Sequence, residues 1–369
     1  MTMTKQTYAP GMHPSLPPPK SSIGVIHWLK ENLFSSVSNS VVTLLAIYML
    51  YLALPSAINW LFIDATYVGE TRKDCAPNGA CLAFIGERFN LFVYGFYPAE
   101  LRWRVNLAFI LLVVASAAVL WDNIPARKYM LKFALVYPLI GVWLLTGGLG
   151  LEHVGTHLFG GLMLTLTIGV TGIVFSLPLG ILLALGRQSD LPIIKYFCIG
   201  FIEFIRGVPL ITLLFVASTM LSYFLPPGTT FDLLLRVLIM VTLFASAYMA
   251  EVIRGGLQAL PKGQLEAAES LGLNYPQAMR FIILPQALKI SIPGIVNTFI
   301  GLYKDSTLVI VIGLLDPLGI GRASVADSAW LGLSTEVYLF VAVFFFISCF
   351  GMARYSLYLE NKLNTGHKR

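Results

Sequence analysis

Long, uninterrupted apolar runs are the feature that most constrains how this 369-residue chain folds. A helix that crosses a bilayer needs about 20 mostly apolar residues, and only helices and closed barrels satisfy the backbone in lipid. The runs are continuous rather than alternating, which excludes a barrel. We therefore predict an all-α integral membrane protein with about eight transmembrane helices. The predicted spans are residues 38–63, 105–121, 131–149, 157–186, 196–225, 233–253, 291–315 and 336–359.

The charge content agrees with a membrane protein. Charged residues make up 12% of the chain, about half of their share in soluble domains. The net charge of +6 does not indicate a nucleic-acid partner, because Lys and Arg are scattered between the apolar runs. They concentrate in alternate loops and in both terminal tails, and basic loops favour the cytoplasmic side. We predict that both termini are cytoplasmic and that the loop 64–104 lies outside.

The composition divides the chain into four regions. Residues 1–37 are polar and Pro-rich and are predicted to be a disordered cytoplasmic tail, and residues 361–369 form a basic cytoplasmic tail. Residues 38–154 make an accessory membrane region of three helices that includes the outer loop. From 155 to 360 the helices gain Gly, Pro and Thr, and small residues allow close helix packing in lipid. We predict that residues 155–360 form a packed or moving core, with the accessory helices before it.

Cysteine and histidine usage leaves one question open. Cys75 and Cys81 lie six residues apart in the loop 64–104. They could form a disulfide if this loop faces an oxidising compartment, and two free thiols are the alternative. His153 and His157 are four residues apart but lack further ligands. We therefore predict no metal site.

A charged pentad occurs twice in the second half of the chain. Residues 203–207 read Glu-Phe-Ile-Arg-Gly, and residues 251–255 read Glu-Val-Ile-Arg-Gly. Acid and base three residues apart share a helix face, so Glu203 faces the same way as Arg206, and Glu251 the same way as Arg254. Pro209 is predicted to break the helix just after the first pentad. Either the arginines anchor the helices by reaching the interface, or the pentads form a cytoplasmic gate or a network that bridges helices.

A second charged group lies inside the seventh span. Lys304, Asp305, Ser306 and Thr307 follow one another between two apolar stretches. Charges at this depth cost a few kcal/mol each unless they are paired or hydrated. They indicate either a transport pathway or a structural ion pair that fixes helix packing.

The polar segment 258–289 interrupts the apolar runs. A short helix is predicted from Gln264 to Leu271, with Gly272 as the left-handed residue that ends it and Leu273 as its hydrophobic follower. Asn274 can cap a second helix that has Pro276 in its first turn. The sequence therefore predicts a helix–turn–helix at the cytoplasmic face.

The first of these two helices has the surface of a docking element. Ala267 and Ala268 leave a low surface that another backbone can approach, and Glu266 and Glu269 offer acceptors to basic groups. The alternative is an amphipathic helix resting on lipid. That alternative fits less well, because the segment lacks a wide basic face.

These residues resemble the EAA loop of ABC importer permeases. Its fixed positions match Glu266, Ala267, Ala268, Gly272 and the Ile282-x-Leu284-Pro285 end of the segment. The flanking segments 202–210, 247–256 and 304–308 are similar to the polar amino-acid uptake branch. The three additional N-terminal spans are similar to the larger permease subunit of general L-amino-acid uptake systems. Val208 in place of Thr, and Ser306-Thr307 in place of Thr-Ser, depart from the branch pattern and leave substrate choice open.

The resemblance implies the function of a transport subunit in the bacterial inner membrane. Glu266, Ala267, Ala268, Leu271 and Gly272 would form the coupling helix that docks on an ABC ATPase dimer. The chain has no Gly-x-x-x-x-Gly-Lys-Ser/Thr loop. ATP and Mg would therefore be bound by that partner, and this chain would be neither an enzyme nor a cofactor protein. A periplasmic amino-acid-binding protein would deliver a broad range of L-amino acids. A second homologous permease subunit would complete a heterodimeric pore.

Other functions make different demands on the sequence. An ion-coupled secondary transporter would use Lys304 and Asp305, but the inverted repeats common in such carriers are not evident. An ABC permease for another small polar solute would share the same loop. A membrane-embedded enzyme lacks support, because neither a catalytic cluster nor a Gly-x-Ser-x-Gly motif occurs.

Overall fold

The computed structural model describes residues 24–121, 123–220, 223, 226 and 231–363. Within these residues the fold is all-α and contains no strand. In the described part of the chain, seven helical segments are long and apolar enough to cross a membrane, and there are eight if one bent pair of helices counts as a span. The predicted all-α membrane class and span number are therefore confirmed.

The chain divides into two compact units. The first contains the residues up to Thr66 together with Cys75–Ala80, and the second contains Tyr67–Asp74 and Cys81–Arg369. The sequence instead placed the boundary at residues 154 and 155. In the second unit, helices of the predicted accessory region pack on helices of the predicted core, and this packing explains why no division occurs there.

The first unit is built around one long apolar helix. Helix α1 (Val25–Asn32) precedes α2 (Val37–Ile58), which continues through the π-helical turn η2 (Asn59–Ile63). The Ser36 hydroxyl caps α2 by accepting from the amide of Asn39 at 3.1 Å. Helix α1 thus stands where a disordered tail was predicted over residues 1–37, while residues 1–23 of that prediction lie outside the described part.

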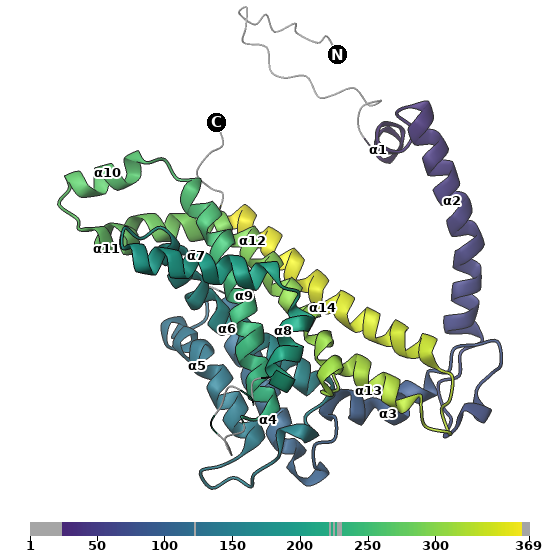
Figure 1. The fold of residues 1–369 in the computed structure, drawn as a ribbon. Coiled ribbons are helices and arrows are strands. Elements are labelled where there is room, and N and C mark those ends of the chain that lie inside the picture. The colour runs from purple at the N-terminus through teal and green to yellow at the C-terminus, as the bar shows by residue number, and fades with distance from the viewer. Residues whose placement is uncertain (1–23, 122, 221–222, 224–225, 227–230, 364–369) are drawn as a thin grey trace, which may run out of the picture. The chain divides into compact units, whose positions relative to one another are not determined.

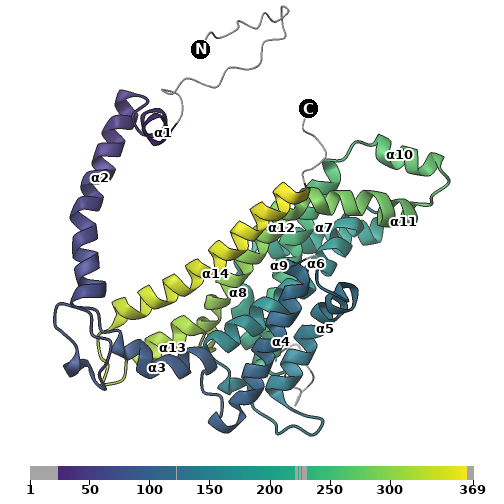
Figure 2. The same ribbon diagram turned by 180° about the vertical axis from the view of Figure 1, so that it is seen from behind.

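The second unit contains the remaining helices (Figures 1 and 2). They are α3 (Ala83–Tyr94), α4 (Arg102–Leu120), α5 (Arg127–Thr146), α6 (Gly161–Arg187), α7 (Pro192–Gly207), α8 (Leu210–Phe215), α9 (Leu233–Gln258), α10 (Gly263–Ser270), α11 (Tyr275–Ala278), α12 (Leu284–Asp305), α13 (Pro317–Ser324) and α14 (Ser334–Leu363). Helices α6, α9 and α12 pack on one another at its centre, and α14 packs on α12. The α10 helix projects from the other helices of this unit in both views.

Glycines allow the central helices to approach closely. A Cβ on Gly180 of α6 would come within 2.6 Å of the Met249 side chain on α9. A Cβ on Gly256 of α9 would lie 2.5 Å from the carbonyl oxygen of Ala287 on α12. At this second contact the Ser291 hydroxyl donates to the carbonyl of Val252 at 3.2 Å. Small residues thus set the helix spacing in this region, as expected for helices packed in lipid.

The fifth predicted span is bent rather than straight. Helix α7 ends at Gly207, Val208 is extended, and α8 begins after Pro209. The bent pair, which runs on through η6 (Val216–Met220), turns by 101°. The helix break that Pro209 predicts is therefore present. The end of the predicted span, at residues 221–222 and 224–225, lies outside the described residues.

The loop 64–104 and the segment before α14 are more helical than predicted. They contain α3 and α13, which pack side by side (Figures 1 and 2). Phe84 of α3 packs edge-on against Trp330 at 5.5 Å between ring centroids, and Arg88 forms an ion pair with Asp327 at 2.5 Å. Cys75 and Cys81 are disulfide-bonded. The helices α3 and α13 were not predicted, because helices this short have too few residues to show a clear periodicity of apolar residues.

Candidate functional site

The first candidate site is the two-helix segment α10–α11. Helix α10 ends in a Schellman motif, in which the amide of Gly272 donates to the carbonyl of Glu269 at 2.9 Å and the amide of Leu273 donates to that of Ala268 at 3.2 Å. Gly272 has φ +81°, a left-handed conformation that favours glycine. The predicted helix end, with Gly272 as its left-handed residue, is therefore confirmed.

Helix α11 restarts at once through a capping box. The Asn274 side chain accepts from the amide of Gln277 at 3.0 Å, and the Gln277 side chain accepts from the amide of Asn274 at 3.1 Å. The chain then passes through the π-helical turn η8 (Met279–Ile283) directly into α12, with Pro285 in the first turn. The loop is thus joined to a core helix without an intervening flexible segment.

The surface of α10 is polar and exposed except at two positions, the half-buried Leu265 and the buried Ala268. The side chains of Glu266, Ala267 and Glu269 are exposed, and Leu271 is 79% exposed. Ala268 is buried and contributes to the inner packing of the loop rather than to its outer surface. Of the two alanines that were predicted to form a docking surface, Ala267 is exposed and Ala268 is not.

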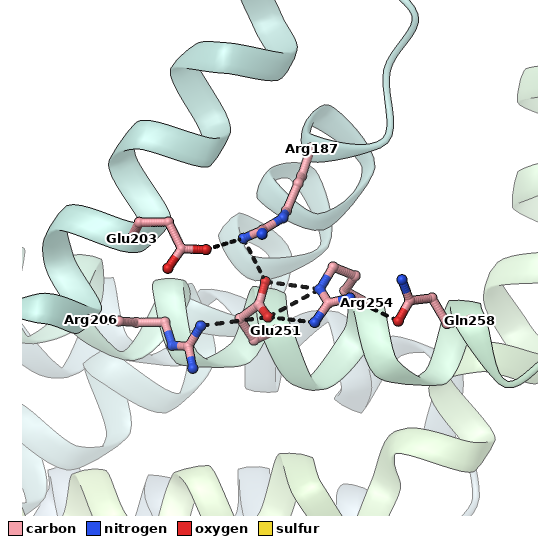
Figure 3. Close-up of polar contacts among 6 residues, drawn as sticks. All are labelled: Arg187, Glu203, Arg206, Glu251, Arg254 and Gln258. Atoms are coloured by element: carbon pink, nitrogen blue, oxygen red, sulfur yellow. Dashed lines mark hydrogen bonds and ion pairs between the residues drawn. The ribbon is translucent and has the colours of Figure 1, made fainter.

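The second candidate site is an ionic cluster where α6, α7 and α9 meet (Figure 3). Glu251 of α9 lies at its centre with its side chain 15% exposed. Arg254 donates to both of its carboxylate oxygens at 2.8–3.0 Å. Arg187 at the end of α6 donates to Oε1 at 2.9 Å, and Arg206 of α7 lies 3.5 Å from Oε2. Three guanidinium groups from three helices therefore surround one carboxylate.

Glu203 belongs to the edge of the same cluster. Its side chain is 55% exposed and accepts from Arg187 at 2.8 Å. No ion pair joins it to Arg206 among the described residues, although the two lie three residues apart on α7. The Arg206 guanidinium instead reaches Glu251 and stands 5.5 Å from the ring centroid of Tyr248. The expected pairing within each pentad is thus present at Glu251 and absent at Glu203.

Two members of the cluster were not singled out from the sequence. Arg187 bridges Glu203 and Glu251, and Gln258 accepts from Arg254 at 2.8 Å. Arg187 is one of the loop arginines from which only the topology was predicted. Its position at the end of the span that precedes the first pentad was the available signal, but only the tertiary fold shows which carboxylates it meets.

The charged group of the seventh span lies where α12 ends. Asp305 is the last residue of α12, and the tighter 3-10 segment η9 (Ser306–Ile312) follows. The Lys304 side chain is exposed, and no ion pair of Lys304 or Asp305 occurs within the described residues. Ser306 and Thr307 donate to the carbonyls of Tyr303 and Lys304 at 2.7 and 3.0 Å. The structural ion pair considered above is therefore not formed in the isolated chain.

A buried carboxylate outside the predicted sites caps α13. Asp316 is fully buried and accepts from the amide of Gly319 at 2.9 Å. Burial raises the pKa of Asp316 from its ordinary value of 3.8 to about 6, against the lowering effect of its backbone hydrogen bonds. No cation pairs with this carboxylate within the described residues, which makes it a useful contrast to Glu251.

Comparison with known proteins identifies the family of the chain. The family model described as "binding-protein-dependent transport system inner membrane component" matches residues 176–364, just over half of the chain. The chain belongs to this family. It is a multi-pass inner-membrane permease component, which is a non-catalytic subunit, and such systems work with an ATPase and a binding protein.

Two relatives match almost the whole chain. The inner membrane amino-acid ABC transporter permease protein YhdY of Escherichia coli (strain K12) is 52% identical, over 96% of this chain and 97% of that protein. The glutamate/glutamine/aspartate/asparagine transport system permease protein BztC of Rhodobacter capsulatus is 46% identical, over 95% and 96%. The probable glutamine ABC transporter permease protein GlnM of Bacillus subtilis is 36% identical over 55% of this chain and 91% of that protein. Part of this chain thus has no counterpart in the shorter relative.

Proposed function

We propose that this chain is the larger permease subunit of an ATP-driven importer of amino acids, with a broad range that includes glutamate, glutamine, aspartate and asparagine. The observation that carries the proposal is the near full-length similarity to two permeases named for amino-acid transport. The residues 38–154 would then be an accessory membrane region, and residues 155–360 the transport core.

The α10–α11 segment would couple transport to ATP hydrolysis. Its exposed Glu266, Ala267 and Leu271 and its well-defined stop at Gly272 suit a rigid element that docks in a groove of an ATPase dimer. The basic residues of the same loop and of the terminal tails support a cytoplasmic location. ATP and Mg would be bound by that ATPase, and alternating access would be the two-state change that ATP biases.

The ionic cluster around Glu251 would act as a latch between helices at the cytoplasmic end of the pathway. Simple anchoring of arginines at the interface explains a guanidinium that reaches the membrane surface. It does not explain three guanidinium groups that converge on one carboxylate from α6, α7 and α9. The helix break at Pro209 would let α7 and α8 move relative to each other during transport.

A second, homologous permease subunit would complete the pore. Lys304 is exposed at the end of a spanning helix in the isolated chain. An exposed charge at this depth is costly in lipid, so a partner subunit or an aqueous pathway would cover it. Asp305, Ser306 and Thr307 would line the same pathway. A periplasmic amino-acid-binding protein would deliver substrate to the outer face.

Reconstitution tests the transport proposal. The chain would be assembled with its ATPase, partner permease and binding protein in proteoliposomes, and uptake of labelled glutamate would be measured. We expect uptake that requires ATP and is reduced by excess glutamine, aspartate or asparagine. Uptake driven by an ion gradient without ATP would instead support a secondary transporter. ATP-dependent uptake of another polar solute, unaffected by amino acids, would contradict the substrate class.

A charge reversal tests the coupling assignment. Glu266→Lys would place a cation on the exposed face of α10, and we expect loss of ATPase docking and of stimulated uptake. Glu87→Lys on α3 is the matched control, since Glu87 is also exposed on a helix but lies outside the coupling segment. Normal complex assembly and uptake in the Glu266→Lys protein would refute the coupling role.

A further inference from the structure

An apolar groove of about 740 Å³ separates two groups of helices in the second unit. Helices α4, α5 and α6 form one side, and α12 and α14 form the other. The lining is almost entirely aliphatic and aromatic, with Ile173, Val296 and Phe299 as typical members. None of the proposed coupling or latch residues lines it, so the groove is separate from the sites described above.

Helices α6 and α12 pack on each other, but α4 and α5 make few contacts with α12 and α14, and the groove lies open between them. Helix α4 packs on α5 and α12 packs on α14. Between α4 and α14, the Tyr355 hydroxyl donates to the carbonyls of Val119 at 2.9 Å and Leu120 at 3.4 Å. The small side chains of Ala115, Ser116 and Ala134 line the groove and leave space that larger residues would fill.

The dimensions of the groove suit an acyl chain. Its lining on α12 extends from Pro285 to Phe299, a length of about 20 Å at the helical rise per residue. One leaflet of the hydrocarbon core is about 15 Å thick. A dry void of this size would forfeit the dispersion contacts of its lining, and a site with so few polar groups does not hold ordered water. Since all five wall helices belong to candidate membrane spans, hydrocarbon is the solvent that fills the groove.

One mouth of the groove is basic. Lys289, near the start of α12, belongs to the lining and has no ion pair within the described residues. Arg127, at the start of α5, donates through Nε to the carbonyl of Ala118 at 3.0 Å near the end of α4. Lys362 adjoins the lining residue Leu363 at the end of α14, where Glu360 is the nearby acid. Basic residues beside an apolar groove attract anionic lipid headgroups.

We propose that this groove is a binding site for a phospholipid with an anionic headgroup. The acyl chain lies along α12 between the two groups of helices, and the headgroup lies at Lys289 and Arg127. The bound lipid completes the packing between the accessory helices and the helix that continues from the coupling segment. The lipid site does not depend on which solute is transported.

Photolabelling of the intact transporter complex tests the site directly. The complex would be placed in nanodiscs of phosphatidylcholine with a small fraction of phosphatidylglycerol that carries a diazirine on its acyl chain. We expect labelled peptides from the groove face of α12 and α14 in the unsubstituted protein, and competition by unlabelled phosphatidylglycerol. Labelling spread evenly over all exposed apolar faces, or absence of label because a partner helix fills the groove, would overturn the proposal.

Matched substitutions separate this site from general lipid contact. Val296→Trp fills the groove and is expected to abolish the labelling there. Val113→Trp, at a 69% exposed position of α4 outside the lining, is expected to leave it unchanged. Lys289→Gln is expected to weaken phosphatidylglycerol binding about fivefold, as measured by native mass spectrometry, and Lys195→Gln on α7 is the control. Equal effects within either pair would overturn the proposal.

Discussion

The two charged pentads have nearly the same sequence but different structures. Glu203 is more than half exposed and meets one arginine, whereas Glu251 is mostly buried and meets three. Gly207 ends α7, because Val208 is extended and Pro209 prevents the helix from continuing. The corresponding Gly255 lies inside α9, which runs on to Gln258.

This difference shows that neighbouring helices decide what a local charge motif does. The acid and base of the second pentad share a helix face that points toward the ends of α6 and α7, so Arg187 and Arg206 can join them. The first pentad lies at the edge, and its arginine turns to Glu251 instead. The cluster therefore has one centre and several outer members, and substitutions should rank accordingly.

Removal of the central carboxylate should have the largest effect. Glu251→Gln leaves three guanidinium groups close together without their shared anion, and loss of one partner from a largely buried ion pair costs about 3–5 kcal/mol. We expect a large drop in the thermal stability of the purified complex and loss of uptake. Unchanged stability and uptake would mean that the cluster is peripheral.

Removal of the bridging arginine should have an intermediate effect. Arg187→Gln breaks contacts to both Glu203 and Glu251, but Arg254 and Arg206 still neutralise Glu251. We expect a loss of about 2 kcal/mol, as for a charged hydrogen bond. A double-mutant cycle of Arg187→Gln with Glu203→Gln should show a coupling energy of about 0.5 kcal/mol or more. If the stability losses of the two substitutions are strictly additive, the ion pair between Arg187 and Glu203 contributes nothing to stability.

Asp316 is a buried carboxylate that, unlike Glu251, has no arginine partner within the described residues. Its folded-state pKa of about 6 exceeds the ordinary value of 3.8. The folded state therefore binds the proton more tightly, and the associated stability is present at low pH and lost as the pH rises through 6. Between pH 5 and pH 7.5 this loss is about 1 kcal/mol.

Asp316→Asn should remove this pH dependence. Melting temperatures of the wild-type and variant complexes would be compared at pH 5 and pH 7.5, and we expect a smaller decrease in the variant. Glu87→Gln, at an exposed position, serves as the control for a general effect of charge removal. An identical decrease in wild type and Asp316→Asn would contradict the assignment of this dependence to Asp316.

Neutralisation of the outer carboxylate should have the smallest effect. Glu203→Gln removes one exposed partner of Arg187, and exposed ion pairs contribute about 1 kcal/mol or less. We expect nearly normal stability, with any change confined to uptake rate. A loss as large as that of Glu251→Gln would show that the two pentads are equivalent after all.

Local signals in the sequence predicted much of this structure. The apolar runs predicted the spans, Pro209 predicted the bend, and Gly272 with Asn274 predicted the stop and restart of the two-helix segment. Each of these depends on residues close together in the chain. The number of spans and the turn chemistry were therefore readable without a tertiary fold.

Features that join distant segments could not be read in the same way. Arg187 meets Glu251 from 64 positions away, and nothing in either local sequence specifies this contact. The burial of Ala268 depends on the packing of α10 against η8, while its neighbour Ala267 remains exposed. Likewise, α4 and α5 were expected to form a separate region, but their packing places them in the same unit as the core.

The direct passage from η8 into α12 has a mechanical consequence. The five residues of η8 and the 22 of α12 form one helical arm, about 40 Å long. If this arm pivots at its α10 end, a tilt of about 5° moves the Lys304–Asp305 end by about 3.5 Å. Pro293 lies within the arm and is the point where a larger load would bend it. A small rotation at the α10 end therefore becomes a larger displacement at Lys304 and Asp305. Bending at Pro293 limits the force that the arm can transmit.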